Sequence, residues 1–155
     1  MGSPKKKQND TIDCGGASAQ LQVDADGIGT ALYSGLLTPS NFLALSVLVM
    51  RAGLARQARG LLYCIDQAVI CFTPDSLPGA YSALAEQLQS LPVAFVTNEA
   101  QAELHRLVVQ RAGEHGLVRR QFGDAQQARQ WLVGVTQALD DNRGWWQKRE
   151  RRPPR

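Results

Sequence analysis

Two runs of mostly apolar residues constrain the fold more than any other feature of the chain. They lie at residues 61–65 and 92–97, and Gly60 opens the first of them. A run that is apolar at every position is typical of a strand covered on both faces, as in parallel sheets packed between helices. Helical patterns precede, separate and follow these runs, so the sequence predicts an α/β domain.

A β-hairpin is expected before the first of these strands. Residues 20–23 alternate in polarity, residues 24–27 are Asp-Ala-Asp-Gly, and residues 28–33 resume apolar character. The predicted fold is an α/β domain in which this hairpin is followed by alternating strands and helices, with a mostly parallel mixed sheet of about five strands and about four helices. The remaining elements are a strand at 117–122 and helices at 39–57, 77–90, 98–115 and 124–141.

Length and charge predict one domain with two basic ends. The 155 residues, 44% of them hydrophobic, suffice for a single core. We expect a single domain at 19–141, a flexible basic leader at 1–18 and a basic, Trp-containing tail at 142–155. The net charge is +3, but the segment 11–142 is mildly acidic, so attraction to polyanions would belong to the ends.

The two ends leave alternatives open. Lys5, Lys6 and Lys7, together with residues 143–155 and their two Trp residues, would suit weak contact with nucleic acid or an anionic membrane. The simpler interpretation is that the Trp side chains pack back on the domain and the rest of the tail is solvated.

Cysteine and histidine placement argues against a metal site, a cofactor and enzymatic activity. Cys14, Cys64 and Cys71 form no CxxC pair, which indicates a reducing cytoplasm. His105 and His115 stand ten residues apart on one predicted helix, without metal-ligand spacing around them and away from any strand end. We therefore expect both histidines to face solvent.

Polar residues gather where the predicted strands end. Asp66 follows the first buried strand, and Thr97 and Asn98 follow the second. Thr73 and Ser76 stand at a predicted helix start, whose free N–H groups would stabilise a phosphate on either hydroxyl. The alternative is that these hydroxyls only cap the helix and Asp66 is an ordinary strand-end residue.

Three segments resemble STAS domains, the module of sulfate transporters and anti-sigma factor antagonists. They are Tyr-Ser-Gly-Leu-Leu-Thr at 33–38, Leu-Leu-Tyr-Cys-Ile-Asp at 61–66 and Val-Ile-Cys-Phe-Thr-Pro-Asp-Ser-Leu at 69–77. The likeness is greatest to small stand-alone bacterial proteins of this type, which also end with a strand and helix similar to 117–132.

The resemblance implies a cytoplasmic regulatory domain that docks a protein partner and performs no catalysis. Its partner-binding residues would be Asp66, Thr73, Asp75 and Ser76, with Ser76 as the phosphorylated serine. A homodimer is a further alternative. Two rival functions remain open, namely a small-ligand module using Asp66, Thr97 and Asn98, and an adaptor that binds nucleic acid or membrane through its ends.

Overall fold

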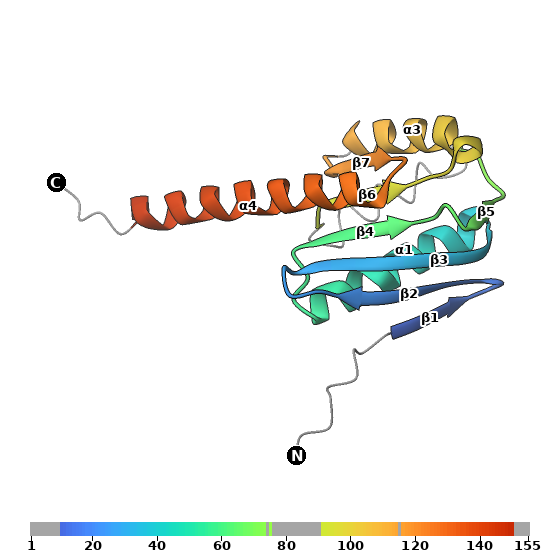
Figure 1. Ribbon diagram of the computed structural model, residues 1–155, viewed down its shortest axis with the longest axis horizontal. Coiled ribbons are helices and arrows are strands. Elements are labelled where there is room, and N and C mark those ends of the chain that lie inside the picture. The colour runs from blue at the N-terminus through green and yellow to red at the C-terminus, as the bar shows by residue number, and fades with distance from the viewer. Residues whose placement is uncertain (1–9, 74, 76–90, 115, 151–155) are drawn as a thin grey trace, which may run out of the picture.

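A mixed seven-stranded sheet with helices on both faces forms the domain (Figure 1). The computed structural model describes residues 10–73, 75, 91–114 and 116–150, with side chains described as far as residue 142 in the last range. The strands are β1 Asp10–Cys14, β2 Ala17–Val23, β3 Ile28–Leu37, β4 Gly60–Cys64, β5 Ala68–Ile70, β6 Val93–Val96 and β7 Arg119–Phe122, and the described helices are α1 Pro39–Ala55, α3 Glu99–Glu114 and α4 Ala125–Glu150.

The strand order is β1-β2-β3-β4-β6-β7, and β5 pairs with the far end of β3. The pairings β1–β2 and β2–β3 are antiparallel, and the other four are parallel. The α/β class is as predicted, but the sheet has more strands than the five expected. The described residues hold three helices where four were predicted, and the helix expected at 77–90 lies outside them.

Strand β1 corrects the prediction of a flexible leader at 1–18. Residues 10–14 alternate between exposed and half-buried, and the side chains of Ile12 and Cys14 pack against the core. Gly15 and Gly16, both at positive φ, form the turn into β2. The five residues of β1 are too few, and too closely flanked by polar residues, for their alternation to indicate a strand in the sequence.

The sheet is covered unequally on its two faces. Helices α1 and α3 bury Leu45, Val49 and Val108 against one face, and α4 buries Ala128 and Leu132 against the other. Strands β4 and β6 are buried at every position because they lie beneath helices on both sides. The two apolar runs of the sequence therefore occupy the centre of the sheet, as predicted.

Helix α4 also corrects the predicted domain boundary. The sequence predicts a basic, Trp-containing tail at 142–155 beyond the domain, but the backbone of α4 continues to Glu150. Apolar periodicity ends near residue 141 because the helix passes beyond the sheet there (Figure 1). Apolar periodicity indicates which residues of a helix face a core, whereas the Gln, Lys, Arg and Glu residues of the sequence after 142 favour a helix through intrinsic propensity.

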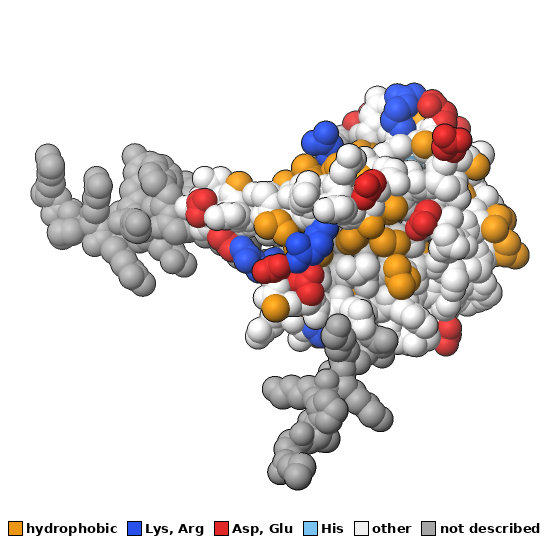
Figure 2. Space-filling view, in the orientation of Figure 1, with side chains coloured by type: hydrophobic (Ala, Val, Ile, Leu, Met, Phe, Trp, Pro, Cys, Tyr) orange, Lys and Arg blue, Asp and Glu red, His pale blue; other side chains and the backbone are white. Residues whose placement is uncertain are grey.

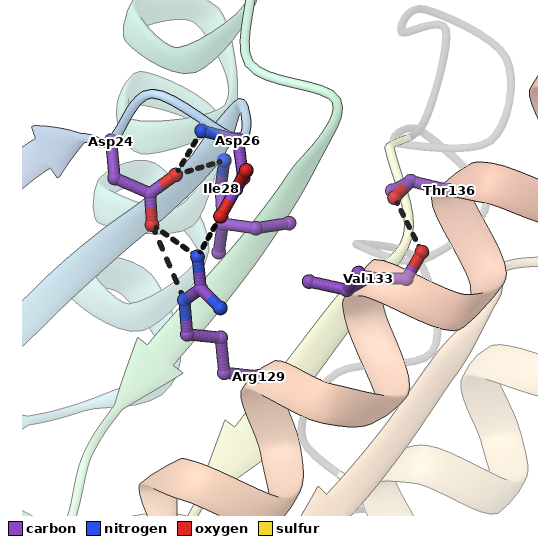
Figure 3. A network of polar contacts seen from close by, with 6 residues as sticks. All are labelled: Asp24, Asp26, Ile28, Arg129, Val133 and Thr136. Atoms are coloured by element: carbon purple, nitrogen blue, oxygen red, sulfur yellow. Dashed lines mark hydrogen bonds and ion pairs between the residues drawn. The ribbon is translucent and has the colours of Figure 1, made fainter.

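An ion-pair network fastens α4 to the turn between β2 and β3 (Figure 3). The Arg129 guanidinium donates to Oδ2 of Asp24 at 3.2 Å and to Oδ2 of Asp26 at 2.5 Å. Asp24 also accepts from the backbone N–H groups of Asp26 and Ile28 through its other carboxylate oxygen. One arginine thus fixes both the turn and the first half of the helix.

His105 is buried, so the prediction that it faces solvent is wrong. Its ring packs against Phe95 at 5.3 Å and Phe42 at 6.2 Å between centroids. Neither ring nitrogen has a hydrogen-bond partner among the described residues. Burial lowers the pKa of His105 from 6.5 to about 4, so the ring is neutral near pH 7. His115 lies outside the described residues.

Acid should destabilise the fold through His105. The unfolded chain takes up a proton near pH 6.5 and the folded chain only near pH 4, so folding free energy is lost as the pH falls between these values. The loss amounts to about 3 kcal/mol. Urea unfolding at pH 7, 5.5 and 4 measures it. In His105→Phe and His105→Leu the pH dependence should be shallower by this amount, and an unchanged slope would contradict the assignment.

Candidate functional site at the carboxyl edge of the sheet

The ends of β4 and β6 are joined by side chains from the start of α3. Asn98 Nδ2 donates to the backbone carbonyl of Asp66 at 3.0 Å. The amide of Gln101, which is buried, donates to the carbonyl oxygens of Ile65 at 2.9 Å and Ala68 at 2.7 Å. These bonds hold the bend that leads from β4 into β5, so the segment after Asp66 is fixed to α3.

Asn98 and Gln101 form a capping box at the start of α3. Gln101 N–H donates to Asn98 Oδ1 at 3.0 Å, and Asn98 N–H donates to Gln101 Oε1 at 3.1 Å. Both polar atoms of the Asn98 side chain are therefore engaged, and Thr97 is buried. Asn98, which with Thr97 is the predicted ligand edge, is therefore held in a structural joint between β4 and α3.

Exposed apolar side chains lie beside this joint. Strand β5 pairs with the end of β3 in a register that sets Val69 opposite Leu36. Their side chains are 57% and 54% exposed, the highest values among the large apolar residues described. Figure 2 shows hydrophobic atoms at the right-hand rim, where Figure 1 has β5. We call Leu36 and Val69 the edge patch.

The edge patch is rimmed by polar residues of the same segment. Asp66 is half-buried and its carboxylate accepts from Gln67 Nε2 at 3.4 Å. Thr73 is exposed, on the stretch that follows β5. The edge patch is not predictable from the sequence, because the three residues of β5 are too few for an alternating pattern that would identify a strand.

Asp75 lies toward the opposite end of α3 from Asp66. Its carboxylate accepts from Arg111 Nη2 at 2.5 Å, in the last turn of α3, whereas Asp66 is held through Asn98 at the first turn. The helix between these contacts is about 20 Å long. The structure therefore does not bring Asp75 to Asp66, and the predicted partner-binding residues follow the length of α3. Ser76 lies outside the described residues.

The cysteines differ in environment. Cys64 is buried beneath α4, and burial, with a smaller effect of the Asp66 charge, raises its pKa to about 11. Cys71 is exposed and Cys14 is half-buried. Within the described ranges no three His, Cys, Asp or Glu side chains are grouped so that they could hold a metal ion.

No protein-family model matches the chain, and no curated protein matches it. None of the described helices combines the length and the apolar character that crossing a bilayer needs.

Cys64 should resist thiol reagents while Cys71 reacts. A pKa near 11 in place of 9.0 lowers the thiolate fraction at pH 8 about a hundredfold, and burial slows access further. In a Cys14→Ser background, labelling by a coloured disulfide reagent should show one fast thiol and one released only on unfolding. Cys71→Ser should remove the fast phase. Rapid labelling of Cys64 in the doubly substituted native protein would contradict this.

Gly35 should be required for the edge patch. It has φ of +91°, and a Cβ there would lie 2.3 Å from the Gly16 carbonyl oxygen, which is backbone and cannot turn aside. Gly35→Ala should destabilise the fold by about 3 kcal/mol. Gly134→Ala, on an open face of α4, is the matched control and should stabilise it by about 0.5–1 kcal/mol. Equal unfolding midpoints for the two variants would refute the argument.

Proposed function

We propose that the protein is a regulatory protein-interaction domain of STAS type, which docks a protein partner at the carboxyl edge of its sheet and performs no catalysis. The observation that carries the proposal is the edge patch. Two large apolar side chains, more than half exposed, stand side by side where β5 pairs with the end of β3. Exposed apolar residues rimmed by polar groups are typical of protein interfaces.

The order of elements supports the same proposal. A hairpin, a helix and a buried strand that is followed by Asp66 occur in the order on which the resemblance to STAS domains rests. In a sheet with parallel central strands, ligands and partners bind beyond the carboxyl ends of those strands. The edge patch lies at that end, where β5 extends the sheet beyond the last residue of β4.

A phosphate on Ser76 would act next to an existing ion pair. Asp75, its neighbour in sequence, binds Arg111 of α3, and this pair is largely exposed. A phosphoserine adds a charge of about −1.5 to −2 and competes for arginine. We therefore propose that phosphorylation would change how the 67–75 segment is held against α3, and with it the affinity for the partner.

Val69→Lys should weaken partner binding without unfolding the domain. The partner is first captured from cells that produce the protein, with the wild-type chain as bait, and is then purified for titration. Val69→Lys should raise Kd at least tenfold, about 1.4 kcal/mol, because it sets a charge in the apolar contact. Asp66→Ala and Ser76→Asp should also change Kd. The free energy of unfolding, measured by thermal denaturation, should change by less than about 1 kcal/mol, since Val69 is exposed.

Leu107→Lys is the matched control. Leu107 is an exposed apolar residue on α3 and is absent from the edge patch. This variant should bind the partner as the wild type does. Equal affinities for Val69→Lys, Asp66→Ala and the wild type would mean that the partner binds elsewhere, and the proposal would fail.

A further inference from the structure

Strand β1 is an edge strand, because it stands last in the strand order and no described strand pairs with its outer side (Figure 1). The two-residue turn 15–16 joins it to β2, so Cys14 and Ala17 close the hairpin as a hydrogen-bonded pair. Such pairs alternate with pairs that are not hydrogen-bonded along an antiparallel ladder. The backbone N–H and C=O groups of Thr11 and Asp13 therefore point away from β2, toward the outer side of the sheet.

The two edges of the sheet differ in charge. At the opposite edge, β7 has Arg119 and Arg120 in succession, and positive charges of this kind discourage pairing with a further strand. Strand β1 has the sequence Asp-Thr-Ile-Asp-Cys, without Lys, Arg or Pro. Asp10 Oδ1 lies 2.6 Å from Nη2 of Arg56, so its charge is compensated within its own copy. The β1 edge is therefore better suited to strand pairing than the β7 edge.

Helix α1 runs along β1 and has an apolar flank beside the edge. Asn41 Nδ2 donates to the Gly15 carbonyl at 3.1 Å, and at the other end of the helix Arg56 binds Asp10. Leu48 lies two turns after Asn41 on the same side of the helix and is 40% exposed. The same side also carries three alanines, Ala44, Ala52 and Ala55. The 17 residues of α1 include a single charged one, whereas the outer side of a surface helix is usually polar.

We infer that β1 pairs in antiparallel fashion with β1 of a second copy, across a twofold axis that passes by Ile12 perpendicular to the sheet. Thr11 then lies opposite Asp13 of the other copy, and each outward N–H group meets an outward C=O group. The two sheets join edge to edge as one continuous sheet, without overlap. The assembly closes as a dimer, because each copy uses the same strand.

The side chains fit this register. The Thr11 hydroxyl can donate to the Asp13 carboxylate opposite it, and no like charges stand directly opposite each other. Moving the axis to Asp13 would set two carboxylates against each other. The two Ile12 side chains meet at the axis, where residues of a pair without hydrogen bonds have Cα atoms about 4.5 Å apart. Ile12 is half-buried in the single chain, and the pairing covers it further.

The dimer also accounts for the apolar flank of α1. A twofold axis perpendicular to the sheet keeps both α1 helices on the same face, antiparallel to each other, one on each side of the joined β1 strands. Leu48 is midway between the contacts of α1 with Gly15 and with Asp10, so it lies at the level of Ile12 and of the axis. The flank of one copy is therefore turned toward the flank of the other. An extended peptide of another protein would use the edge but not this flank.

Cysteine cross-linking of the full chain tests the register. In a Cys14→Ser, Cys71→Ser background, Ile12→Cys should form a disulfide-linked dimer on mild oxidation, because Cα atoms about 4.5 Å apart suit a disulfide. Thr11→Cys is the matched control. It should cross-link far less, since its copy lies two residues along the neighbouring strand, beyond the limit of about 7 Å between Cα atoms.

Sedimentation equilibrium measures the dimer itself. The wild-type chain should show a concentration-dependent dimer, and Thr11→Pro should raise its Kd at least tenfold, because proline removes an outward N–H group and leaves the β1–β2 ladder intact. Thr11→Asp, which sets a second carboxylate against Asp13, replaces it if the proline variant does not fold by circular dichroism. Gln22→Asp adds the same charge to an exposed position of β2, away from the edge, and should dimerise as the wild type does.

Each outcome decides the proposal. A wild-type chain that stays monomeric, a folded Thr11 variant that dimerises as the wild type does, or equal cross-linking of Ile12→Cys and Thr11→Cys would overturn it. A species larger than a dimer would also overturn it, since it would indicate that β1 pairs with the basic β7 edge of the next copy. The test uses no partner protein and leaves the edge patch unchanged, so its result is independent of the proposed function.

Discussion

Burial of β4 and β6 on both faces is the constraint on which the rest of the structure depends. Their side chains alternate between two cores, with Leu61 and Tyr63 facing α1 and α3, and Leu62 and Cys64 facing α4. If either face were uncovered, a row of apolar side chains would be exposed to water. The exposure would cost about 25 cal/mol of folding free energy for each Å² of apolar surface. Helices must therefore lie on both sides of these two strands, while β1 and β2, at the edge, need a cover on one side only.

The face that α3 turns toward the core is set by one polar side chain, that of Gln101. Gln101 is drawn toward the sheet because its amide satisfies two carbonyl groups at the β4–β5 bend. Residues one, two and three turns later then face the core, and these are His105, Val108 and Ala112. Leu107 is left exposed in consequence. A buried histidine is thus a result of fixing the bend beside the edge patch.

The fold class and the helix starts could be predicted from the sequence, since these depend on local chemistry. Apolar runs mark the central strands, and the caps that begin α1 and α3 come from residues close in sequence, Thr38 with Asn41 and Asn98 with Gln101. Apolar spacing alone would turn Leu107 toward the core, because it takes no account of the hydrogen bonds that turn Gln101 toward the sheet. The end of α4 was missed for a related reason, since a helix that leaves its sheet keeps its hydrogen bonds but loses its periodicity.

The candidate site was predictable only in outline. Asp66 and Asn98 do meet at the carboxyl edge, as neighbouring parallel strands require. The edge patch depends on the pairing of β5 with β3, which is a contact between residues more than thirty positions apart in a strand of three residues. The resemblance to STAS domains implies one surface for Asp66 and Asp75, whereas Arg111 holds Asp75 at the far end of α3.

The chain from Asp66 to Asp75, which we call the strap, is held by side-chain contacts at both ends of α3. At the first turn the anchor is a pair of amide side chains, and at the last turn it is an exposed ion pair that salt would weaken. A molecule that displaces the strap from α3 would weaken the hydrogen bonds at the first turn and the ion pair at the last turn together. The amide protons of α3, far more than those of the sheet, should then exchange faster with solvent, so this helix would report on events at the edge.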